Sequence, residues 1–365
     1  MNNQLGFLDG IRGLMALWVL ASHIVPRVNG PTDTFLLKGG IAVDVFMLVS
    51  GILMTHNFYR REHKEPLSEA QTWKRFYIRR FFRIAPLYYL LLAFVLVFAD
   101  PLHQLVLDTG GSRAGHVEQN DALLINVLTH VTFTFGLFPS WSSSNVLPDW
   151  SLSLEMQFYA MFPLMLLLMR ANLIAFFAVT LVAYHVANTA ICVYSALPTG
   201  CLFYPQPTVL PLKVASFAAG MLIVQLTQIR PQWQKIIIAA CFSILVFYLQ
   251  RLTFTALAIG TAAVYYFNVA TLQPSPARTL STLANRILGS APFKFFGDIS
   301  YSVYLCHFLV LLAILPLARD VGWLDIASPW GRFLVACVLI TPPTVLLSWL
   351  LYKFLGIPSS TTHAG

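Results

Sequence analysis

Residues 7–24, FLDGIRGLMALWVLASHI, decide the fold, because this apolar segment is long enough to cross a membrane and still contains Arg12 and His23. The two residues are eleven positions apart. At about 100° per residue an α-helix makes three turns over that distance, so both side chains lie on nearly the same face, about 16 Å apart. Arg12 is then near one end of the helix, and His23 is deep within it.

The composition indicates a polytopic membrane protein. Of the 365 residues, 57% are hydrophobic and 10% are charged, whereas about 25% charged residues are typical of a soluble domain. We therefore expect an all-α polytopic helical bundle that forms a single integral-membrane domain over residues 1–365, with no soluble domain before or after it. The net charge of +8 is too sparsely distributed for a nucleic-acid surface, so no nucleic-acid partner is expected.

The cysteines lie in or beside apolar segments and show no C-x-x-C spacing, so we interpret them as small apolar residues. They are Cys192, Cys201, Cys241, Cys306 and Cys337.

Eleven apolar segments can be marked in the sequence. They lie at about 11–28, 40–58, 82–99, 122–138, 154–169, 172–195, 208–226, 234–249, 252–269, 296–318 and 331–355. The fourth contains Asn126 and His130 and is the weakest candidate for a lipid-facing span, so we expect it to be re-entrant. About ten transmembrane helices remain. A long external connection, residues 100–152, surrounds the fourth segment and is expected to be partly folded and functional.

Basic residues set the expected orientation. The loop over residues 59–81 carries seven of them, which the positive-inside rule places in the cytoplasm together with the N-terminus. The start of the chain has no basic region and no cleavage site, so we expect the first segment to be retained as a helix.

The second half of the chain depends on the fourth segment. If this segment does not cross, seven further basic residues are cytoplasmic, namely Arg170, Arg230, Lys235, Arg278, Arg286, Lys294 and Lys353. Four others are then external, namely Lys213, Arg251, Arg319 and Arg332. If the segment crosses, the two sets exchange sides. Because the positive-inside rule puts the larger set of basic residues in the cytoplasm, the seven-to-four distribution favours ten spans with both termini in the cytoplasm.

Ionisable groups within spans are costly and normally face a bundle interior, a partner or a water-filled cavity. In the ten-span topology, four of them fall at similar depth in the outer half of the membrane, while Arg12 marks the inner side. The four are His23, Asp44, Glu155 and His307.

Each of these groups also has a structural explanation. Asp44 could be paired with a basic residue such as Lys38. His307 could hydrogen-bond a backbone carbonyl between helices, and Glu155 could brace the start of its helix with Ser151 one turn before it. Two histidines and two acids in one apolar bundle are harder to explain in this way.

Histidine titrates near neutrality, so an uncharged imidazole beside a carboxylate can take a proton from a hydroxyl and return it. This chemistry makes the four groups candidates for general acid–base catalysis. His23, His130 and His307 are far apart in the sequence, and no H-x-x-x-H or H-E-x-x-H spacing occurs, so no metal site is expected. A G-x-S-x-G nucleophile motif is also absent from the sequence.

A second constellation is RFYIRRFFRIAPLYYL, in which Arg75, Arg79, Arg80 and Arg83 cluster at the cytoplasmic end of the third segment. A basic collar that binds lipid phosphate would explain it. Arg80 and Arg83, however, are three residues apart on one helix face and could bind a phosphorylated ligand bidentately. The residues alone leave both explanations open.

Five motifs, in order along the chain, carry a resemblance to a known family. Arg12 and His23 form R-x10-H, and VDVFMLVSG, RRFFRIAPLY, DWSLSLEMQFY and GDISYSVYLCH follow. Together they closely resemble the integral membrane acyltransferase-3 family of bacterial O-acyltransferases, and the resemblance runs from one end of the chain to the other.

The resemblance implies an enzyme of the bacterial inner membrane that transfers an acyl group, most often acetyl, from cytoplasmic acyl-coenzyme A to a hydroxyl at the outer side. The acceptor would be a polysaccharide such as an exopolysaccharide or O-antigen, or a lipid-linked glycan. The coenzyme A phosphates would be held by Arg12, Arg79, Arg80 and Arg83. Membrane lipid is the surrounding partner, no metal is needed, and a homo-oligomer is compatible with the sequence.

The resemblance also implies roles for the remaining motif residues. His23 would act as general base on the acceptor hydroxyl or as a transient acyl carrier, with Glu155 orienting it or the acceptor, and His307 would share the catalytic cavity. The acceptor side of that cavity would be lined by Asp44, Asp149, Ser151 and Tyr304.

The sequence departs from the family pattern in two places. Gly356 stands where family members often have a glutamate two residues before proline, and the sequence ends at Gly365, whereas some members carry an appended hydrolase-like domain. We therefore expect the protein to act alone or with a separate partner. The alternative function is a proton-coupled transporter or flippase without covalent chemistry. A small lipophilic acceptor such as a macrolide would keep the chemistry and change the partner, and the acyl chain length is open.

Overall fold

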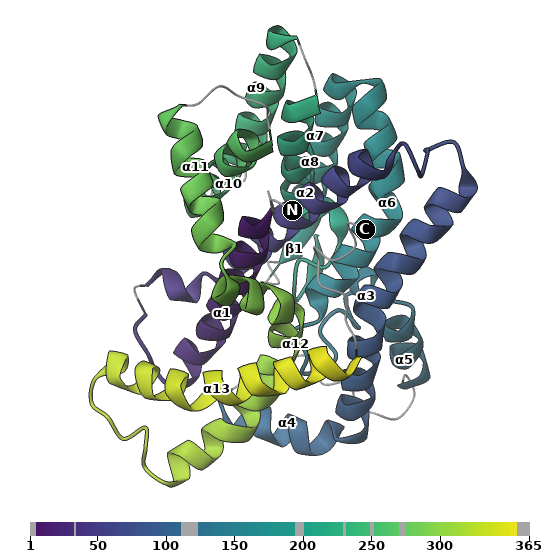
Figure 1. Cartoon of the computed structure of the whole chain (residues 1–365). Helices are drawn as coiled ribbons and strands as arrows, with labels where there is room; N and C mark the ends of the chain where they lie inside the picture. The colour runs from purple at the N-terminus through teal and green to yellow at the C-terminus, as the bar shows by residue number, and fades with distance from the viewer. Residues whose placement is uncertain are drawn as a thin grey trace.

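The structure is a computed structural model that describes residues 5–32, 34–110, 123–193, 201–228, 231–248, 252–269 and 275–355. These residues form thirteen α-helices (Figure 1). In chain order the helices are α1 (Gly6–Arg27), α2 (Gly39–Arg61), α3 (Ala70–Val97), α4 (Ala99–Asp108), α5 (Leu123–Val131), α6 (Trp150–Ala171), α7 (Leu173–Ala190), α8 (Val214–Gln228), α9 (Gln232–Tyr248), α10 (Leu252–Val269), α11 (Pro276–Leu288), α12 (Ala291–Asp320) and α13 (Pro329–Leu355). Three short 3-10 helices, Phe35–Leu37, Phe135–Leu137 and Leu210–Leu212, and two strands, β1 (Ile191–Val193) and β2 (Leu202–Tyr204), complete the described elements.

The all-α membrane bundle predicted from the sequence is confirmed. Each of the eleven apolar segments coincides with a helix, and seven of these helices are long and apolar enough to cross a membrane: α1, α2, α3, α6, α7, α12 and α13. The helices α8, α9 and α10 are also apolar and are shorter. Helices α4 and α11 were not predicted.

The fourth segment does not form a spanning helix. Helix α5 has nine residues, which gives it a length of about 14 Å, roughly half of the ~30 Å hydrocarbon core. A turn and the short helix Phe135–Leu137 follow it. This geometry agrees with the predicted re-entrant segment.

The bundle is held together where helix backbones touch. Helix α1 packs against α12 and α2, and α2 packs against α8. At the α2–α8 crossing, a Cβ atom at Gly220 would lie 2.1 Å from the carbonyl oxygen of Leu48, and one at Gly51 would lie 2.3 Å from that of Phe217. Only glycine permits this approach, which is a common way to pack helices in membranes.

A buried ion pair crosses the same interface. Lys213 Nζ, just before α8, donates to Asp44 Oδ1 of α2 at 2.7 Å, and the two side chains are 10% and 6% exposed. The sequence-based suggestion of Lys38 as the partner of Asp44 is therefore wrong. Lys38 is adjacent along the chain, but it caps the start of α2 as an exposed residue.

We expect Lys213→Met to destabilise the protein by about 3–5 kcal/mol, because it leaves the Asp44 carboxylate buried without its countercharge. Thermal unfolding in nanodiscs measures the effect, with the exposed Lys64→Met as the matched control. The double variant Asp44→Leu with Lys213→Met should recover most of the loss. If Lys213→Met and Lys64→Met unfold at the same temperature, the ion pair does not stabilise the protein.

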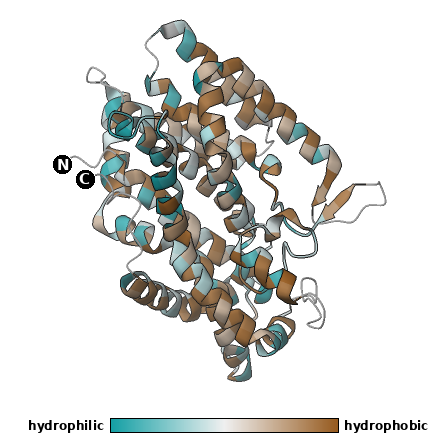
Figure 2. Cartoon of the chain, turned by 90° about the vertical axis from the view of Figure 1, so that its right-hand side faces the viewer, coloured by the Kyte–Doolittle hydropathy of each residue, from teal (hydrophilic) through white to brown (hydrophobic). Residues whose placement is uncertain are grey.

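Two of the cysteines are not simple apolar residues. Cys192 and Cys201 form a disulfide that joins β1 to β2, and the strands pair in parallel, with Ile191 opposite Leu202 and Val193 opposite Tyr204. This corrects the interpretation of those two cysteines, while Cys241 and Cys306 are free and buried. In Figure 2 the strands project on the side opposite the marked chain ends. Disulfides form in oxidising compartments, so this side is expected to face away from the cytoplasm.

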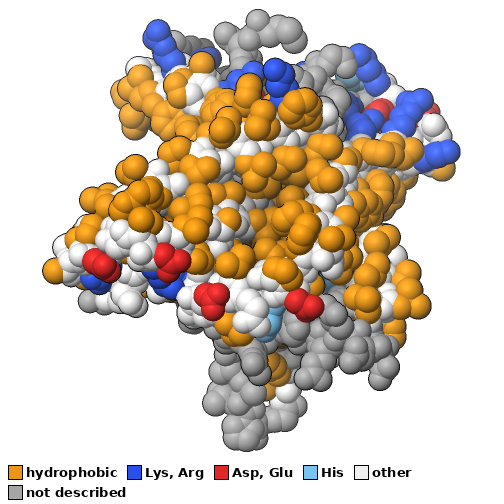
Figure 3. Space-filling view, turned by 90° about the horizontal axis from the view of Figure 1, so that it is seen from below, with side chains coloured by type: hydrophobic (Ala, Val, Ile, Leu, Met, Phe, Trp, Pro, Cys, Tyr) orange, Lys and Arg blue, Asp and Glu red, His pale blue; other side chains and the backbone are white. Residues whose placement is uncertain are grey.

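The charged side chains are also distributed unequally between the side with the chain ends and the side with the strands. Figure 3 shows an apolar belt across the molecule, with Lys and Arg side chains gathered mainly at one edge and acidic side chains at the opposite edge. The basic edge is the one on the side of the marked chain ends. Arg230 and Arg251, which were used for the sequence-based topology, lie outside the described residues, and so does Gly356, which departs from the family pattern.

Candidate active site

Two cavities lie between the helices. The outer cavity has a volume of about 620 Å³ and is bounded by α1, α2, α3, α4, α5, α12 and the connection that leads into α6. The inner cavity has a volume of about 60 Å³ and lies between α1, α2, α6 and α12. Val43 and Tyr304 line both. His23 lines the outer cavity and Arg12 the inner one, so the two ends of the R-x10-H motif face different cavities.

Two histidines meet beside the outer cavity. His23 lines it, whereas His307, which was predicted to share the cavity, is buried behind His23 and does not line it. His23 on α1 and His307 on α12 have ring centroids 5.0 Å apart in an edge-to-face arrangement. His307 Nδ1 lies 3.1 Å from the carbonyl oxygen of Val303. Because a carbonyl only accepts, this nitrogen carries the proton. Nδ1 of His23 and Nε2 of His307 are buried and have no hydrogen-bond partner among the described residues.

The histidine pair is held by a cation on its outer side. The Arg27 guanidinium lies 4.5 Å from the ring centroid of Phe308, and its Nη1 donates to the carbonyl of His23 at 3.2 Å. Phe308 in turn packs edge-to-face on His23 at 5.5 Å. The imidazole of His23 is therefore positioned from both its ring and its backbone, as a catalytic group requires.

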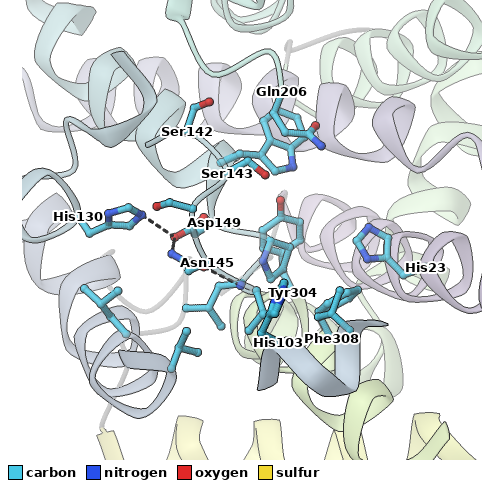
Figure 4. Close-up of a pocket in the computed structure, with 18 of the residues that line it drawn as sticks. His23, His103, His130, Ser142, Ser143, Asn145, Asp149, Gln206, Tyr304 and Phe308 are labelled. Carbon is cyan, nitrogen blue, oxygen red and sulfur yellow. Dashed lines mark hydrogen bonds and ion pairs between the residues drawn. The ribbon is translucent and has the colours of Figure 1, made fainter. Parts of the chain in front are cut away.

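A further polar centre lies on another wall of the outer cavity (Figure 4). His130 Nε2 is 3.8 Å from Asp149 Oδ2, which accepts hydrogen bonds from Tyr88 and Asn145 at 2.9 Å each. Burial raises the pKa of Asp149, and the nearby His130 and these two hydrogen bonds partly offset that rise. The His130 ring stacks on Phe135, with centroids 4.2 Å apart.

The inner cavity contains a carboxylate and an arginine. Glu155 Oε1 accepts a hydrogen bond from Ser50 at 3.3 Å and another from Tyr159, one turn further along α6. Arg12 lines the same cavity and interacts electrostatically with Glu155 and Tyr159. Glu155 therefore lies with Arg12, not in the outer cavity that His23 lines.

Two arginines of α3 approach this inner site. Arg80 lies over the ring of Tyr159, 5.5 Å from its centroid, and interacts electrostatically with Glu155. Arg83 interacts electrostatically with Arg12 and Arg80. Besides Glu155, the carboxylates of Asp9 and Asp298 also interact electrostatically with Arg12. The guanidinium groups can bind an anionic ligand through charge-assisted hydrogen bonds.

Arg79, which was predicted to belong to this set, is engaged elsewhere. Its Nη1 and Nη2 donate to the two carboxylate oxygens of Glu65 at 2.7 and 2.8 Å. These hydrogen bonds lower the pKa of Glu65. A bidentate pair of this kind occupies the face of the guanidinium that a phosphate would use.

A hydrogen bond separates the cavities. Ser151 Oγ donates to the hydroxyl of Tyr304 at 2.8 Å, and the Tyr304 ring lies 6.0 Å from that of Phe46 and 6.2 Å from His307. Tyr304 is common to both linings, so this hydrogen bond lies at the wall that the two cavities share.

The structure thus brings together most of the predicted site residues, in two groups. His23, His307, Asp149 and Tyr304 belong to the outer group, and Arg12, Arg80, Arg83, Glu155 and Ser151 to the inner group. Asp44 lines neither cavity and forms an ion pair with Lys213. Within the described part of the chain, no group of three or more His, Cys, Asp or Glu side chains could hold a metal ion.

The sequence did not single out several residues of the outer cavity. His103, His130 and Gln206 line it and come from segments far apart in the chain. The signal for His130 was present in the sequence, since a histidine four residues after Asn126 in an apolar segment is unusual. Nothing in the sequence marks His103 or Gln206.

Comparison with known proteins gives a consistent result. A family model described as an acyltransferase domain matches residues 5–353. The peptidoglycan O-acetyltransferase OatA of Listeria monocytogenes is 24% identical over 96% of this chain and 55% of its own length. The acyltransferase MdmB of Streptomyces mycarofaciens is 27% identical over 84% of this chain and 79% of its own length. The chain thus spans about half the length of OatA. No solved structure matches it.

Proposed function

The chain belongs to the acyltransferase family whose model matches residues 5–353, and on this premise we propose that it is a membrane O-acyltransferase. It transfers an acyl group, most often acetyl, from acyl-coenzyme A at the cytoplasmic face to a hydroxyl of a glycan at the outer face. The similarity to OatA, a peptidoglycan O-acetyltransferase, supports a glycan acceptor. The protein is a multi-pass membrane protein, and we place it in a bacterial inner membrane with both termini in the cytoplasm.

The observation that carries the proposal is the two-ended site. One end has three arginines around Glu155 and Tyr159, and at the other end His23 lines the larger cavity with the buried His307 packed against it. A coenzyme A thioester is anionic at one end and reactive at the other. Its phosphates are suited to the guanidinium groups, and its extended arm to the path towards His23.

The placement of the two ends relative to the membrane supports the direction of transfer. The chain ends and most basic side chains lie on one side of the molecule, and the disulfide-linked strands lie on the other (Figures 2 and 3). Basic residues favour the cytoplasmic side, and disulfides favour the outer compartment. Arg80 and Arg83 are near the cytoplasmic loop that precedes α3, whereas His23 is near the outer end of α1.

The chemistry follows from these positions. His23 takes the proton of the acceptor hydroxyl, the oxygen attacks the thioester carbonyl, and the carbon–sulfur bond breaks. The imidazolium returns the proton to the departing thiolate, so that an ester and free coenzyme A leave the site. His307, at 5.0 Å, fixes the His23 ring. If His23 instead carries the acyl group transiently, the same residues serve both half-reactions.

Tyr304 is expected to control passage between the cavities. Tyr304→Phe removes the hydrogen bond from Ser151 and keeps the ring. Losing a bond worth about 1 kcal/mol should raise the ratio of donor hydrolysis to acyl transfer about fivefold, because water then reaches the thioester more easily. The ratio is measured with labelled acetyl-coenzyme A, and Tyr89→Phe serves as the control, since Tyr89 lines neither cavity. An unchanged ratio would show that Tyr304 does not limit access.

The test of the proposed function is acyl-coenzyme A turnover by the purified protein in lipid nanodiscs, with acetyl, propionyl and succinyl donors. Slow release of coenzyme A that increases when a glycan is added supports the proposal. If no donor binds or turns over with or without glycan, the enzyme assignment is wrong, and proton-coupled flux becomes the next measurement.

A further inference from the structure

His130 and Asp149 form a buried polar centre in the wall of the outer cavity. Both side chains line the outer cavity and are nearly fully buried, with 2% and 4% exposure. The 3.8 Å between Nε2 and Oδ2 exceeds the 2.7–3.2 Å of a direct N–H···O hydrogen bond. His130 Nε2 has no hydrogen-bond partner among the residues that the structure describes.

The orientation of the His130 ring is fixed. Its Nδ1 lies 2.8 Å from the carbonyl oxygen of Asn126, and this nitrogen must donate because a carbonyl only accepts. The ring also stacks on Phe135 with an interplanar angle of 3°. Nε2 therefore cannot turn away from Asp149 without losing both interactions.

The carboxylate is fixed in the same way. Asp149 Oδ2 accepts from the Tyr88 hydroxyl and from Asn145 Nδ2, both at 2.9 Å, and these donors come from α3 and from the connection before α6. In Figure 4, His130 points toward Asp149 on one side of the cavity, and His23 lies on the other side. The centre is thus built into the wall and is separate from the catalytic pair.

A ligand hydroxyl satisfies the unpartnered ring nitrogen. In the neutral ring, whose proton is on Nδ1, Nε2 accepts, and a hydroxyl can donate to it at hydrogen-bond distance. A carbonyl can only accept, so it cannot be the partner of Nε2. The nearby lining consists of neutral hydrogen-bonding side chains, Ser142, Ser143, Asn145 and Gln206, which suits a neutral ligand with several hydroxyls.

We infer that His130 and Asp149 form an acceptor subsite that binds a second hydroxyl of the molecule whose first hydroxyl is acylated at His23. The acceptor class is therefore a neutral polyhydroxy compound, such as a sugar residue, and not an isolated alcohol. This inference rests on the proposed function for the role of His23, while the subsite itself rests on the geometry of the two side chains.

The test compares two acceptors that share a ring and a primary hydroxyl: methyl glucoside, which has further hydroxyls, and cyclohexylmethanol, which has none. With acetyl-coenzyme A, the wild-type protein should favour methyl glucoside by at least tenfold in kcat/KM. In His130→Phe, which keeps the stacking ring, and in Asp149→Asn, which keeps its shape, this ratio should fall to near one, mainly through the KM of the glucoside. Leu128→Ala, on the same helix and outside the cavity lining, should retain the wild-type ratio.

A purely structural role would lower transfer to both acceptors equally and leave their ratio unchanged, and this result would overturn the inference. Binding is measured independently of turnover by saturation-transfer difference NMR of methyl glucoside with the protein in nanodiscs. Saturation of the sugar protons in wild type that is lost in both variants supports the subsite even if no acyl transfer occurs. Equal signals in wild type and variants, or no signal in wild type, would overturn it.

Discussion

His23→Ala is expected to slow acyl transfer by about 10²- to 10⁴-fold, the range that a positioned general base contributes. The imidazole lines the outer cavity, contacts His307 and Phe308, and has a buried Nδ1 with no hydrogen-bond partner among the described residues. The ring of His307 contacts His23, and its Nδ1 donates to the backbone carbonyl of Val303. The measurement is kcat with acetyl-coenzyme A and a glycan acceptor.

The control for this prediction is His63→Ala, since His63 is exposed and lines neither cavity. Binding of the donor to His23→Ala should remain close to wild type, because the arginines that hold it are at the other end of the site. Transfer by His23→Ala at more than half the wild-type rate would show that another group is the base.

Arg83→Ala should raise the KM of the acyl donor by about 10- to 100-fold, with a smaller effect on kcat. A charge-assisted hydrogen bond contributes about 1.5–3 kcal/mol, which corresponds to this range. Arg83 interacts with Arg12 and Arg80 around the inner cavity, so its removal weakens the anion site directly. Donor titrations at saturating acceptor concentration measure the change.

Arg75→Ala is the matched control, because Arg75 is on the same helix, is exposed and lines neither cavity. The collar explanation makes a different prediction. If the arginines of α3 only bind lipid phosphate, Arg83→Ala and Arg75→Ala should have similar small effects on the KM of the donor.

The spanning helices could be predicted because long apolar runs are a local property of the sequence. Helix α11 was missed because its apolar residues are spaced for one face of a surface helix: Leu280, Leu283 and Ile287 are exposed, while Arg278 and Arg286 lie between and beside them. An average over a window cannot distinguish such an amphipathic pattern from a polar loop. Helix α4 was missed in the same way.

The candidate site was predicted in part for a similar reason. Arg12 and His23 are on one helix, so their spacing in the sequence predicted their positions relative to each other. His23 and His307 meet across 284 residues of sequence, and the resemblance, not the spacing, suggested a shared cavity. The Asp44–Lys213 pair, the Arg79–Glu65 pair and the disulfide all depend on which elements the fold places side by side. No local pattern contains that information.

The central claim is that the donor and the acceptor reach the protein from opposite sides of the membrane. The direct test uses sealed proteoliposomes with labelled acetyl-coenzyme A trapped inside and a neutral oligosaccharide that cannot cross the membrane outside. We expect label to appear on the external oligosaccharide with wild type and not with His23→Ala, and no transfer when both substrates are only outside. Equal transfer with both substrates on the same side would contradict the two-ended site.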